Sequence, residues 1–393
     1  MSQQLVYTES YFDGSSYHNE GPYKVTVSDG VIEAVTPCTS GDLPDDHAKF
    51  IMPGLVEAHC HLFLDGGELD LKKRSEYLKA PFEEMIEVAH KSVAANMAAG
   101  ITLIRDAGDK YGVNHQVRRE AEESREVTPS IRSPGLGVRK PRRYGGFMAR
   151  EVESRDEIKT AVEELLETGD ELKILLTGII DFESGSVKGT PQFDVEETKF
   201  IVDMAHALGR RTFAHCSGLL GLEVAAEAGV DSVEHGFFMT RDILEILAEK
   251  QIAWVPTFSP VYGQWTHPEV VGWCDETIGH LRNILDSHLE HVAMAAEMGV
   301  PLVVGSDAGS LGVVHGKAVI DEILFFLEAG LKLEAALNAA TSLPRRLWNF
   351  DSIDVAPKNR AEFITLAASP FENPENLRHV SAIFKDDTFV KIG

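Results

Sequence analysis

The chain has 393 residues, with 62 acidic and 37 basic side chains and a formal net charge of −25 at pH 7. Nucleic acids and anionic membranes are bound through clustered cations, so we predict that neither is a partner. No stretch approaches the roughly 18 apolar residues that span a bilayer, and residues 1–11 lack the pattern of a signal peptide. The four cysteines are widely spaced and form no CxxC motif, which favours a cytoplasmic protein with reduced thiols.

Short β-strands with turn residues between them are predicted at both ends of the chain. Residues 5–7, 23–27 and 31–35 are apolar-rich runs near the N-terminus, and Asp-Gly pairs stand in the turns. Residues 362–366, 380–384 and 389–392 repeat this pattern near the C-terminus. We therefore predict one small β-sandwich domain, built from residues 1–52 together with residues 355–393.

The middle of the chain alternates short apolar runs with segments of helical length. Runs of this kind occur at residues 54–56, 102–104, 130–132, 173–176, 211–214, 231–233, 252–255 and 301–304. Eight strands that alternate with helices are typical of an α/β fold of the (β/α)8 TIM-barrel type, which we place at residues 53–354.

Three of the helices have recognisable ends, because the predicted segments 195–208, 222–228 and 275–298 are each followed by glycine. Two long loops, at residues 63–80 and 257–273, follow the first and seventh strands. Loops in these positions emerge at the carboxyl ends of barrel strands, where the active sites of such barrels form.

The strongest local motif is His59-Cys60-His61, directly after the first apolar run. Residues two apart in a strand point to the same face, so both imidazoles should face the barrel interior while Cys60 points the other way. Two hydrogen-bonded core histidines are the alternative interpretation. A shared metal ion accounts better for two adjacent imidazoles at the end of a central strand.

Three further polar residues close separate predicted strands. His215 follows residues 212–214, His235 ends residues 232–235, and Asp307 follows residues 303–306. The carboxyl ends of barrel strands meet at one level, so these side chains should converge with the two histidines of the first strand. Four imidazoles and one carboxylate form a site suited to zinc-like divalent metals.

The order of these motifs along the chain resembles that of the amidohydrolase superfamily. Lys173 begins the fourth predicted strand, and the stretch Leu172-Lys173-Ile174-Leu175-Leu176-Thr177-Gly178 is similar to the branch with Xaa-Pro dipeptidases, arginine/lysine carboxypeptidases and imidazolonepropionase-like proteins. In that branch the lysine of this strand is carbamylated and bridges two metal ions, so the resemblance implies the same for Lys173. The physical reason is that an unmodified lysine beside two dications would be repelled, and a carbamate on its amine removes that conflict. A surface lysine at the start of a strand is the alternative.

The resemblance implies two divalent metal ions, with zinc favoured. Their ligands would be His59, His61 and Asp307 for the first metal, His215 and His235 for the second, and carbamylated Lys173 as the bridge between them.

The implied enzyme is a metal-dependent hydrolase that cleaves an amide C–N bond, in a dipeptide or an N-acyl amino acid, with a hydroxide that bridges the metals. Asp307 would act as the catalytic residue, taking the proton of the nucleophile and returning it to the leaving amine. A deaminase of a nitrogen heterocycle is the first alternative, although deaminases typically use one metal and no bridging lysine. A non-catalytic scaffold is the second, although such relatives usually lack several ligands.

Candidate substrate-binding residues follow the third and eighth strands. Arg139, Arg142 and Arg143 form a basic run in an acidic chain and could hold a substrate carboxylate, with Tyr144 beside them. A solvated loop is an equal alternative for this run. Relatives commonly carry a histidine in this loop, so the substrate contacts differ here. His315 is a further candidate, against a surface loop histidine. We expect a small-molecule substrate, and a homo-oligomer with the dimer as the default.

Overall fold

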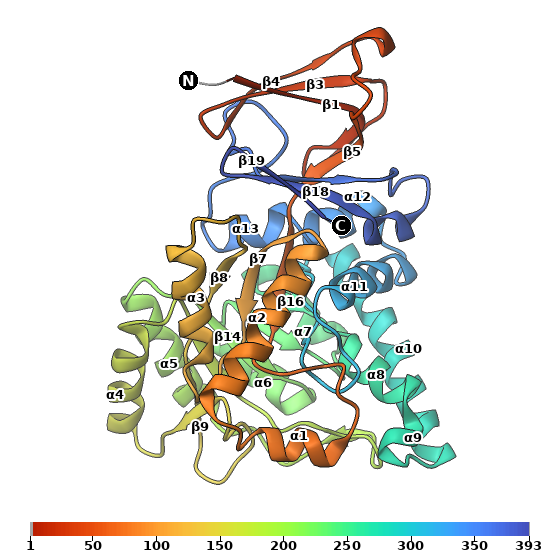
Figure 1. The fold of residues 1–393 in the computed structure, drawn as a ribbon. Coiled ribbons are helices and arrows are strands. Elements are labelled where there is room, and N and C mark those ends of the chain that lie inside the picture. The colour runs from red at the N-terminus through yellow and green to blue at the C-terminus, as the bar shows by residue number, and fades with distance from the viewer. Residues whose placement is uncertain (1–2, 393) are drawn as a thin grey trace.

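Strands from both ends of the chain pair with one another in the computed structural model, which describes residues 3–392 (Figure 1). The junction is β5 (Ala48–Pro53), which runs parallel to β1 (Gln3–Phe12) and antiparallel to β17 (Phe363–Leu366). The order along the sheet is β19-β18-β17-β5-β1-β3-β4, and β2 pairs with β1. The remaining strands are β2 (Tyr17–His18), β3 (Tyr23–Ser28), β4 (Val31–Pro37), β18 (Val380–Lys385) and β19 (Thr388–Lys391).

Both ends of the chain therefore contribute to one β-unit, as the sequence indicates. The hydrogen bonds form a single path through this unit, whereas a sandwich has two separate sheets. The physical reason is β5, which pairs with a strand from each end. Val25, Ile51 and Phe363, from the two halves of the sheet, are buried in one shared apolar cluster.

Parallel strands alternate with helices in the rest of the chain, giving a mixed α/β fold. Seven of the eight predicted strands are present, in two parallel sheets. The first sheet contains β6 (Leu55–Cys60), β7 (Ile101–Asp106) and β8 (Ser130–Arg132). The second has the order β10-β9-β11-β14-β15-β16 and consists of β9 (Gly137–Arg139), β10 (Ala149–Glu151), β11 (Leu172–Leu175), β14 (Thr212–Cys216), β15 (Ser232–His235) and β16 (Ala253–Val255).

The eighth predicted strand, residues 301–304, is not a regular strand. Its backbone nevertheless lies between the two sheets, because Val303 N–H donates to Trp254 of β16 and Val304 accepts from Ala58 of β6. Within residues 3–392, no ladder joins β8 to the second sheet. The hydrogen-bonded strands thus form an arc that is not closed on that side.

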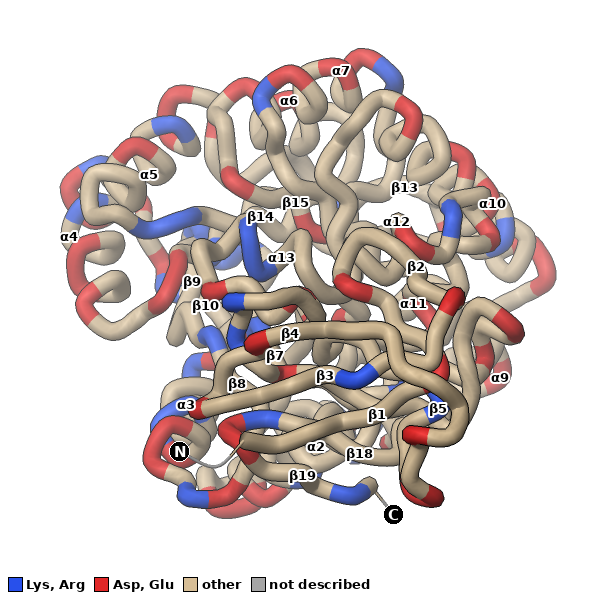
Figure 2. The backbone as a smooth tube through the Cα atoms, turned by 90° about the horizontal axis from the view of Figure 1, so that it is seen from above, with Lys and Arg blue, Asp and Glu red and all other residues tan. Residues whose placement is uncertain are grey.

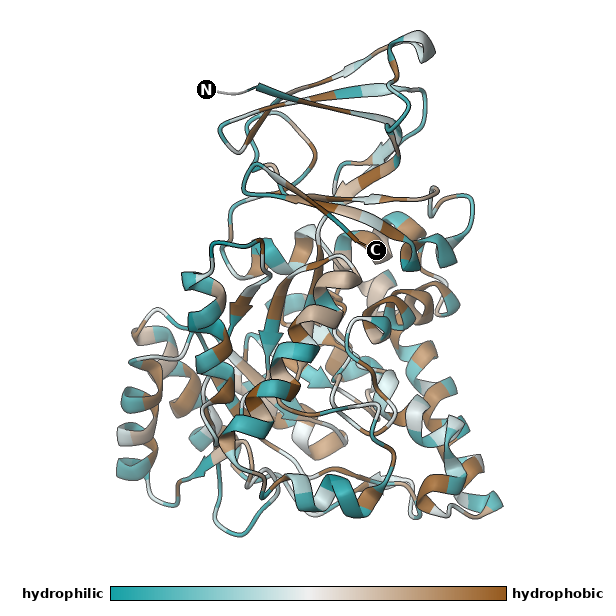
Figure 3. Ribbon diagram, in the orientation of Figure 1, coloured by the Kyte–Doolittle hydropathy of each residue, from teal (hydrophilic) through white to brown (hydrophobic). Residues whose placement is uncertain are grey.

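The helices surround these strands, and their apolar faces are turned inward (Figure 3). In α2 the buried residues are Met85, Ala89, Ser92 and Asn96, which recur at helical spacing. The larger helices are α2 (Phe82–Ala98), α3 (Val113–Glu123), α4 (Arg155–Leu166), α5 (Val195–Ala207), α6 (Leu219–Ala228), α7 (Arg241–Lys250), α10 (Asp275–Met298) and α11 (Lys317–Glu328). Two shorter ones, α12 (Leu333–Ala339) and α13 (Ser342–Leu347), precede the C-terminal strands.

The predicted helix ends are confirmed for the three segments followed by glycine. α6 ends at Gly229, with a φ of 77°, and α10 ends at Gly299, with a φ of 78°. α5 starts after Asp194, whose carboxylate accepts the N–H of Glu197 at 2.8 Å. Glycine accommodates the left-handed conformation that closes a helix without steric strain.

The two long loops contain short helices that the sequence analysis did not predict. α1 (Leu71–Tyr77) begins after Asp70, whose carboxylate accepts the backbone N–H groups of Lys72 and Lys73. α8 (Ser259–Thr266) and α9 (Pro268–Val271) both carry proline in their first turn. Two small strands, β12 (Ile180–Asp181) and β13 (Ser186–Val187), form a hairpin after β11. α1 lies at the end of the molecule opposite the terminal sheet (Figure 1).

Acidic residues are distributed along the outer helices, including α4, α5 and α10 (Figure 2). The −25 charge is therefore spread around the molecule, as expected for a solvated surface. None of the helices in residues 3–392 combines the length and the apolar content needed to cross a membrane.

A buried ion pair joins the terminal sheet to the rest of the chain. The guanidinium of Arg345, in α13, donates to Glu362 at 2.7 Å and to Thr102 of β7 at 2.8 Å. The ammonium of Lys385 lies 3.9 Å from the other carboxylate oxygen of Glu362. Burial alone would raise the pKa of Glu362, but Arg345 and Lys385 outweigh it, and the pKa is lowered.

Glu362→Gln should destabilise the protein by about 3–5 kcal/mol at neutral pH, because two buried cations lose their counter-charge. The free energy of unfolding in urea measures this effect. The contribution of Glu362 is complete above its ordinary pKa of 4.5 and is lost as the pH falls through the lower folded-state value. Wild type and variant should therefore converge in acid.

Glu163→Ala is the matched control, because Glu163 forms only an exposed pair with Lys159 on α4. We expect it to change the free energy of unfolding by about 0.5 kcal/mol or less. An equal decrease in the free energy of unfolding in the two variants would contradict a structural role for the buried pair.

Candidate metal centre

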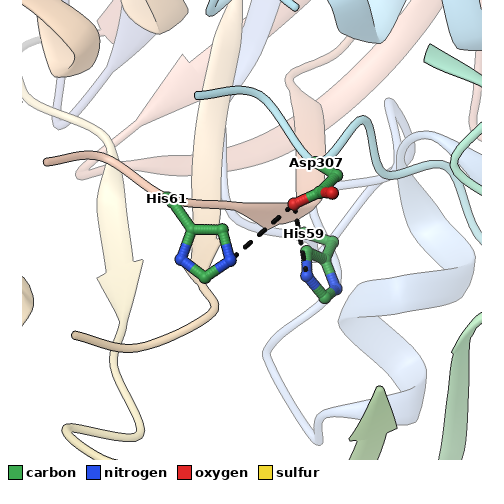
Figure 4. Close-up of side chains that lie close together, drawn as sticks. All are labelled: His59, His61 and Asp307. Atoms are coloured by element: carbon green, nitrogen blue, oxygen red, sulfur yellow. Dashed lines mark ion pairs between the residues drawn. The ribbon is translucent and has the colours of Figure 1, made fainter. Parts of the chain in front are cut away.

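Two histidines and an aspartate meet at the end of β6. His59 lies in β6, His61 directly follows it, and Asp307 approaches from the segment after residues 301–304 (Figure 4). One carboxylate oxygen of Asp307 lies 3.7 Å from the Nε2 atoms of both histidines. The ligand atoms of these three residues lie within 4.8 Å of one another, which is compact enough to hold one metal ion.

Two more histidines stand at the ends of the neighbouring strands. His215 belongs to β14 and His235 ends β15, and their ring centroids are 4.6 Å apart. The ring of His235 lies 5.0 Å from that of His59, so the two groups of histidines are adjacent.

Lys173 completes this arrangement from β11, the strand next to β14. It pairs in register with Phe213, and its ammonium lies 5.9 Å from the centroid of that ring. Lys173 is only 1% exposed. The structure thus brings together all six residues that the sequence proposes as ligands, and all six line one cavity.

The four imidazoles are held in their neutral form. Burial lowers the pKa of His215 to about 3, and it lowers the pKa of His59, His61 and His235 well below the usual value. The charge of Lys173 lowers the pKa of His59, His61 and His215 further. A neutral imidazole offers the lone pair that a metal requires.

Three of the four imidazoles use their Nδ1 atom for a contact with the protein. Nδ1 of His59 contacts the Glu234 carboxylate at 2.6 Å, and Nδ1 of His61 contacts the Gly108 carbonyl at 3.1 Å. Nδ1 of His235 contacts the Thr257 hydroxyl at 2.7 Å. The Nε2 atoms of His59 and His215 are buried without a hydrogen-bond partner in the described chain. Unpaired buried nitrogens are costly, and a divalent cation would satisfy them. These residues fit a metal centre.

Burial has opposite effects on the two remaining groups of the centre. It lowers the pKa of Lys173 and raises the pKa of Asp307, because each side chain loses the hydration that stabilises its charged form. The nearby opposite charge partly counters each shift. A lysine with this environment is a better nucleophile than an exposed one, since more of its amine is unprotonated.

The backbone is strained where it presents these side chains. Asp307 and His235 both have positive φ, at 54° and 69°. The buried carboxylate of Glu57 supports the first of these turns, because it accepts the backbone N–H groups of His59 at 3.0 Å and Ser306 at 2.9 Å. Residues in such conformations concentrate at functional sites.

The six residues of the centre form part of the wall of a cavity of about 910 Å³. Part of its wall is apolar and comes from loops that follow the strands, including Phe147, Ile179, Phe182, Phe237 and Leu311. α1 and the residues after it supply charged groups, among them Lys73, Arg74 and Lys79. The cavity can therefore hold a molecule much larger than a single amino acid.

Of the predicted substrate-binding residues, the structure places Tyr144 in the cavity wall. Its ring lies 5.1 Å from that of His215. Burial raises the pKa of Tyr144, and the charge of Asp307 adds to the shift, so the hydroxyl stays protonated and can donate a hydrogen bond.

Arg139, Arg142 and Arg143 are not among the residues that line the cavity. Arg139 donates to Glu151 at 2.6 Å, Arg143 binds the carbonyl of Thr190, and Arg142 is exposed. Local partners, which the sequence does not reveal, thus occupy two of these guanidinium groups.

His315 is also outside the cavity lining. It is 6% exposed, and its Nε2 atom contacts the carbonyl of Leu64 at 3.0 Å. In this position it supports the loop after β6.

Two functional residues of the site were missed by the sequence analysis. Glu234 contacts His59, and Arg105 donates to Glu234 at 2.7 Å. A charged residue inside a strand that is otherwise buried is the signal that could have indicated both of them, because such residues are rarely buried without a partner.

A model of the amidohydrolase family matches residues 50–391 of this chain. An uncharacterized protein of Mycobacterium tuberculosis is 28% identical over 369 residues, which cover 93% of this chain and 91% of that protein. Ochratoxinase of Aspergillus niger is 24% identical over 415 residues, covering 94% of this chain and 82% of that enzyme.

The fold is likewise similar to a solved Xaa-Pro dipeptidase with methionine bound in its active site. The TM-score is 0.82 at 22% identity, over 99% of this chain and 100% of the dipeptidase. The matched residues include every strand and loop that builds the centre described above. The chain therefore belongs to the amidohydrolase family and is a hydrolase that acts on carbon–nitrogen bonds.

Proposed function

We propose that this chain is a binuclear metal-dependent enzyme that hydrolyses the amide bond of a peptide-like or N-acyl amino acid substrate. The observation that carries the proposal is the adjacency of two ligand groups, His59–His61–Asp307 and His215–His235, with buried Lys173 at the same cavity. One metal ion would engage the first group and leave the histidines of the second without a partner. Two ions would satisfy both groups.

The proposed metal is zinc, because imidazole and carboxylate ligands suit it. Lys173 would be carbamylated, which would replace a buried cation by an anionic ligand that bridges the two ions. When bound, the metals would lower the pKa of water and polarise the carbonyl of the substrate. Burial supports the carbamate, since it favours the unprotonated amine that reacts with carbon dioxide.

Asp307 is the proposed proton carrier. Its carboxylate faces both His59 and His61, and burial raises its pKa. It can therefore accept the proton of the attacking water and donate it to the leaving amine nitrogen. The Tyr144 hydroxyl is the proposed hydrogen-bond donor to the substrate carbonyl oxygen, because it lines the cavity on the side of His215.

The wall of the cavity supports an amide with a bulky apolar substituent. The Xaa-Pro dipeptidase that is similar to this chain is, by its name, an enzyme that acts on dipeptides. If the substrate has a carboxylate, Lys73 and Lys79 are the proposed contacts, because these cations line the cavity and the Arg139–Arg143 run does not, while the guanidinium of Arg74 is bound to backbone carbonyls.

We further infer that residues 53–354 act as a (β/α)8 barrel. Residues 301–304 support this inference, because their backbone bonds to both β16 and β6 and so occupies the place of an eighth strand. The centre then lies at the carboxyl end of the barrel, as in other enzymes with this fold.

The substrate class can be tested by incubating the zinc-loaded enzyme with dipeptides, N-acyl amino acids and small cyclic amides. Each compound should be paired with an analogue that lacks the free carboxylate. Release of an amine from the first two classes is the expected result. Release of ammonia from a nitrogen heterocycle, by a protein with about one zinc ion per chain, would instead indicate a deaminase.

Metal binding should depend on carbon dioxide. We expect apoenzyme reconstituted with zinc in bicarbonate to hold about two ions per chain, and apoenzyme reconstituted without carbon dioxide to hold about one. Native mass spectrometry should show an increase of one carbon dioxide only in the first sample. Two ions and full activity without any such increase would contradict the carbamate.

Lys173→Met should lower kcat/KM by about 10³-fold or more, because the bridging ligand is lost and the second metal with it. Lys91→Met is the matched control, since Lys91 is exposed on α2 and outside the cavity lining. Similar activity of the two variants would show that Lys173 is not a ligand of the metal centre.

Tyr144→Phe should lower kcat by about 10²-fold with little change in KM, because the hydroxyl is proposed to bind the carbonyl oxygen most strongly as its negative charge develops. Steady-state kinetics on the best amide of the screen measure the two constants. Tyr262→Phe, on α8 and outside the cavity lining, should leave both unchanged. A rise in KM alone would show that Tyr144 only binds the substrate.

A further inference from the structure

The four histidines of the centre differ in the group that holds the ring nitrogen pointing away from the cavity. Neutral oxygens contact three of them: the Gly108 carbonyl, the Gly178 carbonyl and the Thr257 hydroxyl contact His61, His215 and His235, respectively. The partner of His59 is the carboxylate of Glu234, at 2.6 Å. One of the two proposed metal positions is thus supported by a charge, and the other is not.

Glu234 is itself held firmly in place. It is 0% exposed, and the oxygen that does not contact His59 accepts from Arg105 at 2.7 Å and from Ser232 at 2.6 Å. The carboxylate has a donor on each oxygen, so its orientation is fixed. Burial disfavours the charge of Glu234, and these donors, one of them a cation, stabilise it.

Arg105 is anchored on several sides. Its Nε atom donates to the Ala58 carbonyl at 2.6 Å, and its guanidinium lies 4.6 Å from the ring centroid of Phe213 and 5.0 Å from that of Trp348. Glu171 provides a second carboxylate at 3.7 Å. Arg105, Glu234 and His59 are all buried, and their contacts cross the interior from β7 in the first sheet to β15 in the second and back to β6.

A carboxylate acts on an imidazole in two ways. It accepts a hydrogen bond from Nδ1–H and so fixes the tautomer that leaves Nε2 free, and its charge makes that nitrogen a stronger ligand than a neutral acceptor would. The Nε2 atom of His59 fits this role, because it is buried without a hydrogen-bond partner and lies 3.7 Å from Asp307.

We propose that Glu234, held by Arg105, is a positioning residue that makes the His59–His61–Asp307 position the tighter of the two metal sites. This inference rests on the binuclear centre of the proposed function. The position at His215 and His235, which is supported by neutral oxygens, fills second and loses its metal first. The two ions are therefore bound in a fixed order.

The order of filling can be measured on the wild-type enzyme. Apoenzyme is loaded with about one zinc ion per chain, and anomalous scattering at the zinc edge gives the occupancy of each position in crystals. We expect most of the zinc between His59, His61 and Asp307. Filling of the other position first, or equal filling, would overturn the proposal, and this measurement needs no variant.

Glu234→Gln tests the role of the charge, because glutamine keeps the shape and an oxygen that can accept a hydrogen bond from Nδ1–H of His59. Competition with a chelator gives the two zinc dissociation constants. We expect the smaller Kd to rise about 10–100-fold and the larger one to stay within about twofold. An unchanged smaller Kd, or an equal rise in both, would overturn the proposal.

Thr257→Ala is the matched variant on the other position, since it removes the neutral partner of His235. It should raise only the larger Kd. Binding of two zinc ions with no effect of Glu234→Gln would refute this inference and leave the proposed function intact. Binding of only one zinc ion per chain to the wild type would refute both. If Glu234→Gln does not fold, the order of filling in the wild type decides the question.

Discussion

The crowding of six ionisable side chains in one largely buried place is the constraint on which the rest of the structure depends. Lys173 and four imidazoles lie together with Asp307 on five chain segments; His215 and Asp307 are half-buried and the other four are buried, so water stabilises their charges poorly. The effective cost of burying an ion is several kcal/mol, so such a cluster persists only if its members share partners. The protein keeps the imidazoles neutral, and the charges of Lys173 and Asp307 stabilise each other. This is also the state that receives metal ions with the least rearrangement.

The backbone around the cluster is organised to hold it in this state. Positive φ angles at Asp307 and His235 are strained conformations for residues other than glycine, each costing of the order of 1–3 kcal/mol. They persist because neighbouring contacts determine them. Glu57 accepts the backbone N–H groups of Ser306, next to Asp307, and of His59 in β6, and Asp307 N–H donates to the His59 carbonyl. The terminal sheet, at the opposite end of the molecule from α1, takes no part in this arrangement (Figure 1).

The sequence predicts those parts of the site that depend on position along a strand. His59 and His61 share a face because side chains alternate, and His215, His235 and Asp307 follow apolar runs whose carboxyl ends meet. The sequence does not predict contacts that depend on which strand lies opposite. Glu234 is 175 residues from His59, and Glu151 pairs with Arg139 only because β10 returns beside β9. The sequence also does not predict whether an apolar run forms a regular strand, since residues 301–304 are apolar and yet form only isolated backbone hydrogen bonds.

The wall that faces the substrate is joined mechanically to the segment that carries Asp307. Arg74, in α1, donates to the Gly309 carbonyl at 2.7 Å and to the Glu68 carbonyl at 3.1 Å, so one guanidinium connects the loop after β6 with the turn after Asp307. Gly309 has a φ of 100°, and an added Cβ would lie 2.7 Å from the His61 carbonyl, so the turn can approach β6 this closely only with glycine. A substrate that displaced α1 would therefore pull on the turn that positions Asp307. The proposed ligands other than Asp307 lie on or directly after strands, whereas this wall lies on loops, so changes in the loops can alter specificity while those side chains stay in place.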